Sequence, residues 1–436
     1  MRRMIAFCFV MTMCLFTIIS SALASTFGFG KEVTVQPGIV FDKNGVSIEI
    51  VDFSYKSSGA ILTVKIHNNT NTEISVLGGA VGYDVYSVNR YMTGASYVNK
   101  NIEAKENLQI DIQFDDPALQ LFGIDGIAEL EFGFLLEDEN DNELRTGPIK
   151  IHTSEHEGYN YSKNTYREYV SGSNFERDFG VECISFTEET LAKGNGVEVA
   201  SWGVFRNINN ELVLMIETKN NSDATVYLQG EGLCINGLKV SGTTLCYENM
   251  NPGCTSLCSI NLTNLLEEKI ATLFNIGEID NVSFCAQVRD DNYKVIIPEF
   301  QMYFSINNAN NSFNVNGVEL YNDNGIRLVY LDMYGGKTKY DDGIYAMFFV
   351  ENRSGKDIAL DTENVYLNGE RVAASFFGDV DNQECSAVEL ILYNYSFSKY
   401  NIEKTEDIKT MSIEFELRDT KYNTIDEFAV EVPIKN

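Results

Sequence analysis

Short runs in which hydrophobic and polar residues alternate recur along this chain. One such run extends from 130 to 136. In it Phe132 and Phe134 share one side of an extended backbone, and Glu131 lies on the other side. A period of two predicts a β-strand with one face in a hydrophobic core and the other toward solvent. The polar turn and further hydrophobic run that follow predict a hairpin.

This run occurs three times, at offsets of 152 and then 129 residues. The matching positions are Ile127, Leu130, Phe132, Phe134, Leu136 and Asp138; Ile279, Val282, Phe284, Ala286, Val288 and Asp290; and Ile408, Met411, Ile413, Phe415, Leu417 and Asp419. Three other landmarks also recur: the turns Asn44-Gly45, Asn195-Gly196 and Asn324-Gly325, the strand ends at Asn68, Asn220 and Asn352, and the turns at Asn89, Asn236 and Asn368. A register held over so many positions indicates three copies of one unit.

Each copy has about seven short strands with turn signals between them, which is typical of an immunoglobulin-like sandwich. The sequence therefore predicts an all-β protein: three tandem immunoglobulin-like antiparallel β-sandwich domains after a signal peptide. A small β-barrel with the same number of strands is the alternative. The predicted boundaries are 1–24 for the signal peptide, 33–153 for repeat 1, 154–180 for a linker or short helical insert, 181–306 for repeat 2 and 312–436 for repeat 3.

The N-terminus has the pattern of a secretory signal peptide. Two arginines precede an apolar run of about 15 residues, which is shorter than the roughly 20 residues needed to cross a bilayer. Small residues follow at Ala22 and Ala24, which predicts cleavage before Ser25 and a secreted, extracellular protein. A membrane anchor is the alternative. The sequence has no second apolar span, so no membrane insertion is expected.

Composition limits the possible partners. The chain of 436 residues has 33 basic and 63 acidic residues, a formal net charge of −30, and no basic stripe, so nucleic acid is not an expected partner. With 44% hydrophobic residues, the composition is that of a folded, globular chain.

Signals for catalysis or metal binding are weak in the sequence. The three histidines are His67, His152 and His156, and none suggests a catalytic triad. His152 and His156 are four residues apart, as zinc ligands on a helix are, but the segment is predicted to be strand and linker, so no metal or cofactor is expected. The turns 138–143 and 379–382 resemble parts of a calcium loop, yet each lacks essential features, and a solvated hairpin tip is preferred.

Seven cysteines follow the signal peptide, and six belong to repeat 2. Because the chain is predicted to be exported, these six are disulfide candidates: Cys183, Cys234, Cys246, Cys254, Cys258 and Cys285. Their pairing does not follow from the sequence. Reduced thiols and a thiolate metal site are the alternatives, and Cys385 makes the total odd.

The repeat landmarks resemble those of secreted Firmicute proteins that carry tandem immunoglobulin-like domains of unassigned function. This resemblance extends over nearly all of 33–436 and implies an exported bacterial protein. We therefore expect a non-enzymatic extracellular protein that binds another protein or a cell-envelope polymer, or has a structural role. The alternatives are a carbohydrate-binding accessory protein, with or without calcium, and a secreted hydrolase.

Overall fold

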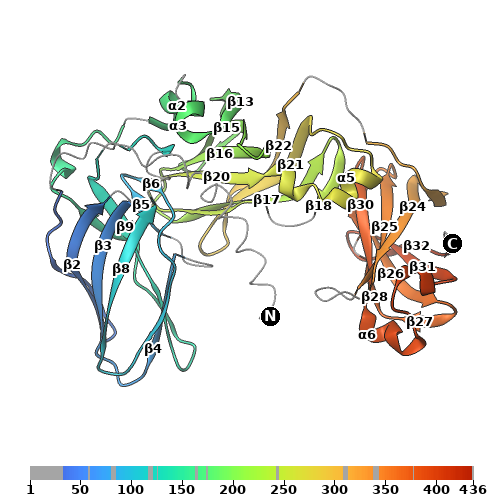
Figure 1. Cartoon of the computed structure of the whole chain (residues 1–436), viewed down its shortest axis with the longest axis horizontal. Coiled ribbons are helices and arrows are strands. Elements are labelled where there is room, and N and C mark those ends of the chain that lie inside the picture. Colours follow the sequence, from blue (N-terminus) through green and yellow to red (C-terminus); the bar gives the residue numbers. More distant parts are fainter. Residues whose placement is uncertain are drawn as a thin grey trace. The chain divides into compact units, whose positions relative to one another are not determined.

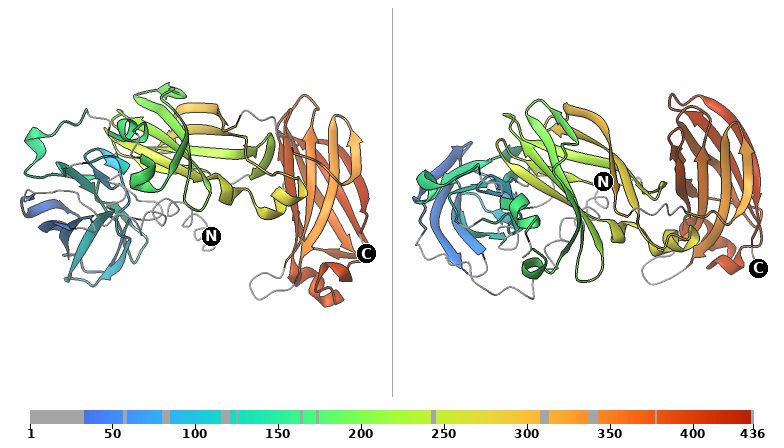
Figure 2. Two further views of the ribbon diagram at one scale, coloured as in Figure 1. Left: turned by 45° about the horizontal axis from the view of Figure 1, so that its top comes forward. Right: turned by 90° about the horizontal axis from the view of Figure 1, so that it is seen from above.

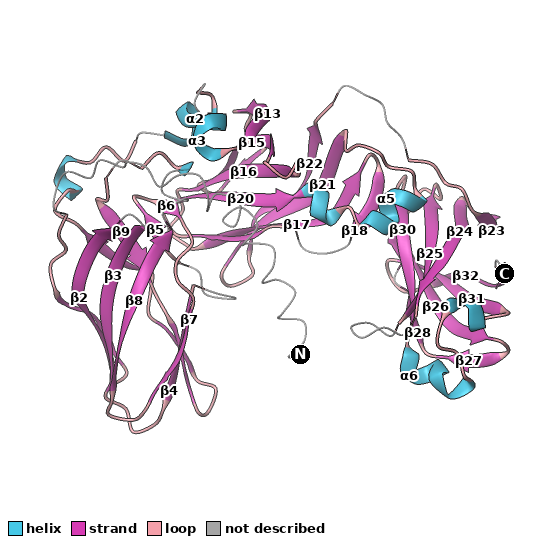
Figure 3. Ribbon diagram, in the orientation of Figure 1, coloured by secondary structure: helices cyan, strands magenta, loops and turns pink. Residues whose placement is uncertain are grey.

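The computed structural model describes residues 33–434, apart from 57–58, 80–84, 116–120, 125, 163–164, 173–174, 242–244, 308–312, 337–342 and 377. The predicted signal peptide, with its cleavage site at Ala22, Ala24 and Ser25, lies outside the described residues. Strands dominate the described chain and pair mainly antiparallel (Figure 1), which confirms the predicted all-β class of sandwich-type domains. The helices are short pieces between the strands (Figure 3).

The chain divides into two compact units. Unit 1 comprises Met1–Gly230, Leu245–Thr263 and Ala286–Phe300, and unit 2 comprises Glu231–Thr244, Asn264–Cys285 and Gln301–Asn436. The division passes through three strands of the predicted repeat 2, so the boundaries of three separate immunoglobulin-like domains stay a prediction.

The strands up to β16 belong to unit 1, together with β19 and β20. They are β1 Gly38–Lys43, β2 Val46–Lys56, β3 Gly59–Asn68, β4 Ile74–Gly78, β5 Ser87–Val88, β6 Tyr91–Met92, β7 Val98–Ile102, β8 Asn107–Asp115, β9 Glu129–Phe132, β10 Leu135–Asp138, β11 Glu143–Arg145, β12 Ile149–His152, β13 Glu182–Thr187, β14 Ala192–Gly194, β15 Val197–Arg206, β16 Leu212–Asn220, β19 Tyr247–Met250 and β20 Thr255–Asn261. Three sheets result in the described residues: β1-β2-β3-β8, β11-β10-β4-β7 and β12-β9-β5-β6-β20-β16-β15-β13, with β14 paired to β15.

Three strands cross the division, and the others belong to unit 2. The crossing strands are β17 Val226–Ile235, β21 Asn281–Asp290 and β22 Val295–Ser305. The strands of unit 2 are β18 Leu238–Ser241, β23 Val318–Asp323, β24 Ile326–Gly335, β25 Ile344–Asn352, β26 Ile358–Leu367, β27 Glu370–Val372, β28 Ala374–Phe376, β29 Gly378–Val380, β30 Cys385–Leu392, β31 Met411–Asp419 and β32 Thr424–Val432. The order β30-β25-β24-β23 makes one sheet layer, and β27-β26-β31-β32 makes another.

The alternating strands meet in a hydrophobic core in each unit. In unit 1, Leu62, Val64 and Ile66 of β3 are fully buried, as the period of two requires. In unit 2, the orange and red layers of Figure 2 face each other across such a core. There the ring of Phe376 packs edge-on against the rings of Phe348 and Phe415, with centroids 5.6 and 5.3 Å apart.

The recurring Asn-Gly pairs are tight hairpin turns. Asn44 and Gly45 have φ of 52° and 78°, and the pairs at 195–196 and 324–325 have the same positive signs. Two successive positive φ angles define the turn that matches the twist of a hairpin, and Asn-Gly adopts it at the lowest cost. This local chemistry explains why the sequence landmark coincides with the β1–β2 and β23–β24 turns.

A fully buried asparagine ends one strand in each repeat: β3, β16 and β25. The Asn68 side chain donates to the carbonyl oxygens of Thr72, Ile102 and Glu103 at 2.8–3.1 Å and accepts from Thr70. Asn220 and Asn352 make the corresponding bonds in repeats 2 and 3. The landmark therefore has one structural purpose in all three copies: it satisfies backbone groups where two loops meet.

The segment 154–180, predicted to be a linker or short helical insert, contains η2 His156–Gly158, α2 Thr165–Val170 and α3 Phe175–Phe179. Tyr166 and Phe175 are buried in the core of unit 1. The other helices are α4 Leu262–Leu265, α5 Glu268–Leu273, α6 Asn394–Phe397, η3 Ser398–Tyr400 and η4 Thr405–Asp407.

Candidate functional site

Strand β9 of unit 1 is buried on both faces. Leu130 and Phe132 face the hydrophobic core, as predicted. Glu129 and Glu131 point to the opposite face, yet their exposed fractions are only 1% and 3%. The expectation that this face meets solvent is therefore wrong for β9. A buried carboxylate requires partners that compensate for its lost hydration, and their identity defines the candidate site.

Glu131 joins repeat 1 to the turn that precedes β20. Its Oε2 accepts from Ser87 Oγ at 2.9 Å, from Asn251 Nδ2 at 2.8 Å and from Cys254 Sγ at 3.3 Å. Its Oε1 lies 3.0 Å from Lys150 Nζ. Ser87 and Lys150 belong to repeat 1, whereas Asn251 and Cys254 belong to repeat 2, so one carboxylate binds groups from both.

Backbone pairing continues this junction. Tyr91 of β6 and Thr255 of β20 are partners in a parallel bridge, and the Thr255 amide donates to the Arg90 carbonyl at 2.8 Å. The Asn251 side chain donates to the Val85 carbonyl at 2.7 Å. Through these contacts a sheet of repeat 1 continues into strands of repeat 2 within unit 1.

Glu129 has cations on one side and a histidine on the other. Its Oε1 lies 3.2 Å from Lys150 Nζ and 3.7 Å from Arg90 Nε, and its Oε2 lies 3.2 Å from His152 Nε2. Burial by itself would lower the pKa of Lys150, but Glu131 and Glu129 outweigh that effect and raise it. Lys150 therefore stays charged between the two carboxylates.

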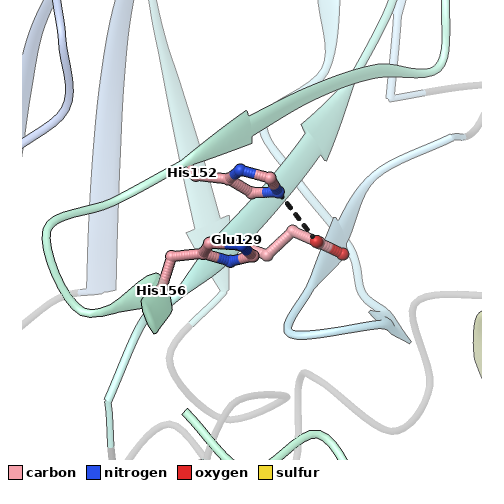
Figure 4. Close-up of side chains that lie close together, drawn as sticks. All are labelled: Glu129, His152 and His156. Carbon is pink, nitrogen blue, oxygen red and sulfur yellow. Dashed lines mark hydrogen bonds and ion pairs between the residues drawn. The ribbon is translucent and has the colours of Figure 1, made fainter. Parts of the chain in front are cut away.

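Two imidazole rings stack beside Glu129 (Figure 4). His152 ends β12 and His156 begins η2, and their rings are parallel within 9° with centroids 3.5 Å apart. His156 Nδ1 is 2.8 Å from Tyr161 Oη, and the Arg90 guanidinium lies 4.2 Å from the centre of the Tyr161 ring. A strand end followed by a tight turn thus brings the two histidines together, although they do not share an α-helix.

Sequence reasoning missed Glu129, but a signal for this region exists. At the third landmark, repeats 2 and 3 have Gly237 and Gly369 after the asparagine, where φ is positive. Repeat 1 has Arg90 there, with φ of 69°. A bulky residue in this conformation is strained, so its presence suggests a specific task for the side chain. Arg90 reaches both Glu129 and Tyr161.

The two calcium-like turns are organised by their own hydrogen bonds. Asp138 Oδ1 accepts from the amides of Asn140 and Asn142, and the bonds from Asn142 lower the pKa of Asp138. Asp290 and Asp419 accept equivalent amide bonds at the other two hairpins. In the second turn, Asn382 Oδ1 accepts from the Gly355 amide. At 138–143 these oxygens hold a hairpin tip between β10 and β11. The turn 379–382 instead joins β29 to β30, which belong to different sheets, so its interpretation as a hairpin tip is wrong.

The cysteines are thiols in this structure, distributed over several strands. Cys183 lies on β13, Cys234 on β17 and Cys285 on β21, where Cys285 Sγ is 3.2 Å from Gln301 Oε1. Burial and the nearby Glu131 raise the pKa of Cys254 well above that of an ordinary thiol, which suits its role as a neutral donor.

Cys246 and Cys258 approach each other closely. Their sulfur atoms are 2.7 Å apart, and both side chains are buried. Sulfur atoms that are not bonded to each other normally stay farther apart, and a disulfide bond is about 2.05 Å long. This close approach makes Cys246 and Cys258 a candidate pair for a disulfide bond.

Comparisons with known proteins identify no family. No family model and no curated protein matches the chain. Solved structures that align with it include an exo-chitosanase of Amycolatopsis orientalis, with 9% identity, a TM-score of 0.18, and 52% of this chain and 26% of that chain covered. A second is a 1.5-MDa bacterial ice-binding adhesin, with 8% identity, a TM-score of 0.13, and 86% of this chain and 90% of that chain covered. A third is the BSP domain of a biofilm associated protein, with 10% identity, a TM-score of 0.13, and 96% of this chain and 68% of that chain covered.

At these TM-scores the alignments carry no argument about fold or function. The chain spans about a quarter of the chitosanase chain.

In the part of the chain that the structure describes, none of the helices has the length and apolar character that a membrane crossing requires.

Proposed function

We propose that this chain is an exported, non-enzymatic protein that binds a cell-envelope polymer or another protein. The N-terminal sequence pattern supports export, with cleavage after Ala24. The observation that carries a binding role is a pair of exposed tyrosines at corresponding hairpin tips in repeats 2 and 3. The strongly acidic composition supports a partner other than nucleic acid.

The two tyrosines occupy the same position in equivalent turns. Tyr293 lies in the turn between β21 and β22, and Tyr422 lies in the turn between β31 and β32. Each amide donates at 2.9 Å to the carbonyl of the aspartate three residues earlier, and φ is 62° and 61°. The exposed fractions are 68% and 80%.

Local contacts explain these tyrosines only in part: the Tyr293 ring lies edge-on to the Tyr227 ring, with centroids 6.4 Å apart. Positive φ favours glycine or asparagine, and another residue costs about 1 kcal/mol there. An exposed ring regains little of this through burial. Two copies of the unit thus break the same local rule at the same point, which suggests that the rings serve a contact outside the chain. A tyrosine ring offers a rigid apolar face and a polar hydroxyl, which suits sugar rings and protein surfaces alike.

The buried carboxylates support a non-enzymatic role. A glycosidase needs one carboxyl group that is protonated and one that is ionised. Here the two carboxylates share one partner: Lys150 Nζ lies 3.2 Å from Glu129 Oε1 and 3.0 Å from Glu131 Oε1, which is the arrangement of a buried structural ion pair. Within the described residues, the three histidines form hydrogen bonds with carboxylate, side-chain amide and phenol groups.

The tip tyrosines give a test that separates binding from stability. We expect the chain from Ser25 to Asn436 to co-sediment with an insoluble polymer from a panel of peptidoglycan, cellulose, chitin and starch. Tyr293→Gly combined with Tyr422→Gly is expected to reduce the retained fraction at least about tenfold, while the melting temperature stays equal or rises because strain is relieved. Asp141→Gly, at the corresponding tip of repeat 1, is the matched control.

Equal retention of the double variant and the wild type would contradict the role of the tyrosines. Retention that disappears with a chelator would favour the calcium-dependent carbohydrate alternative. If the wild type binds no polymer, carbohydrate is excluded as the partner within this panel, and the same variants then test binding to surface proteins by cross-linking.

Export also predicts a specific disulfide. In an oxidising compartment, Cys246 and Cys258 are expected to form a bond: each thiol loses its hydrogen, and an external disulfide such as oxidised glutathione accepts the two electrons. Non-reducing peptide mapping of the secreted protein should recover the two cysteines in one linked species. Replacing both by serine should lower the free energy of unfolding by about 2 to 3 kcal/mol. Cys385→Ser is the control that leaves the link intact, and alkylation of both thiols without reductant would contradict the prediction.

A further inference from the structure

We propose that Glu129, His152 and His156 bind a divalent transition metal ion of the zinc class. One ligand atom from each residue lies within 4.8 Å of the others. The three residues come from the start of β9, the end of β12 and the beginning of η2 (Figure 4). The exposed His152 gives an ion access from solvent, and the buried Glu129 provides the negative charge.

The donor set matches the chemistry of zinc. Two imidazoles and one carboxylate are a known three-residue ligand set, with the fourth position of the tetrahedron left for water. Two atoms that each bind such an ion at about 2.0 Å are about 3.3 Å apart. The observed distance between His152 Nε2 and Glu129 Oε2 is 3.2 Å.

Neighbouring groups already orient the ligands. An Nδ1–H of His156 that donates to Tyr161 Oη leaves Nε2 as the unprotonated nitrogen that binds a metal. Arg90 holds the Tyr161 ring through its guanidinium.

The carboxylate is oriented in the same way. Lys150 and Arg90 approach Oε1 of Glu129, which leaves Oε2 directed at the histidines. Together with Glu131, these four charged groups sum to zero, so no net positive charge opposes an incoming cation. Lys150 thus orients Glu129 without removing it from the site.

Metal binding requires one local movement. A metal ion lies in the plane of each imidazole that binds it, whereas the two rings are now parallel and stacked. The rings must therefore tilt apart as the ion enters. The side chain of His152 is 47% exposed and can rotate toward solvent without disturbing the core.

Equilibrium dialysis against zinc, with bound metal measured by mass spectrometry, tests the proposal. The chain from Ser25 to Asn436 is first stripped with a chelator and its thiols are alkylated, so that cysteines cannot bind the ion. We expect one zinc ion per chain in the wild type. His152→Ala and His156→Ala are each expected to weaken binding more than about 100-fold, and Tyr161→Phe about tenfold.

His67→Ala is the matched control, because His67 lies on β3 and bonds to Glu49 and Asn107 instead. Its zinc affinity should equal that of the wild type. Circular dichroism and the melting temperature of the metal-free variants show whether each one is folded. The proposal is overturned if the wild type binds no zinc, or if the folded His152→Ala and His156→Ala variants bind it as tightly as the wild type.

Discussion

Alanine in place of Asn68 is expected to lower the free energy of unfolding of unit 1 by about 4 kcal/mol. The side chain is fully buried and makes five hydrogen bonds, three of them to carbonyl oxygens of two different loops. Its removal leaves several buried polar groups without partners, and each costs about 1 to 3 kcal/mol. Differential scanning calorimetry of the folded variant measures the change.

Asn69→Ala is the matched control for this prediction. Asn69 is the next residue in the same turn, but it is exposed. Its substitution should change stability by less than about 0.5 kcal/mol. The corresponding substitutions Asn220→Ala and Asn352→Ala should be as harmful as Asn68→Ala, because these side chains make the same bonds in their own repeats. A mild effect at Asn68 would show that the surrounding loops have other ways to satisfy their carbonyl groups.

The second large effect is expected for Glu131→Ala, which should destabilise unit 1 by about 3 kcal/mol and loosen the contact between β6 and β20. The substitution removes the acceptor shared by Ser87, Asn251 and Cys254. Breaking a buried ionic network is costly because the remaining groups stay desolvated. Lys150, at 41% exposure and still paired with Glu129, limits the loss.

Hydrogen exchange measured by mass spectrometry distinguishes a local from a global effect of Glu131→Ala. Amides around Tyr91 and Thr255 should exchange faster than those of the β2–β3 pair, whose contacts do not involve Glu131. Glu131→Gln keeps an acceptor and should have a smaller effect. Glu139→Ala removes an exposed carboxylate at a hairpin tip and is the control. Unchanged exchange at Tyr91 and Thr255 would contradict the role of Glu131 at this junction.

The expected role of Glu131 illustrates how a repeated strand can acquire a new function. The corresponding residues in the other two copies of the closing strand are Ser283 and Ser412, and the pattern of alternation is the same in all three. In repeat 1 that pattern places two carboxylates on the face that β20 and the Asn251 turn approach. The local pattern is unchanged, and the neighbouring chain decides whether the polar face is wet or buried.

Several features of this protein follow from the sequence alone. Alternation of period two identifies strands, because side chains on successive residues point to opposite faces. Asn-Gly pairs identify hairpin turns, because few other pairs tolerate two positive φ angles. The repeated Asn68, Asn220 and Asn352 mark equivalent strand ends. These are local rules, and the structure confirms the all-β class that they predict.

Only the tertiary structure decided which polar groups meet. Glu129 and His156 are 27 residues apart in the sequence, and Asn251 is 120 residues from Glu131. No periodicity relates such positions, since their proximity depends on how sheets pair and pack after the strands have formed. The same is true of Cys246 and Cys258, whose pairing the spacing left open. The strands and turns thus depend on short-range backbone preferences, whereas the candidate metal site and the buried junction depend on long-range packing.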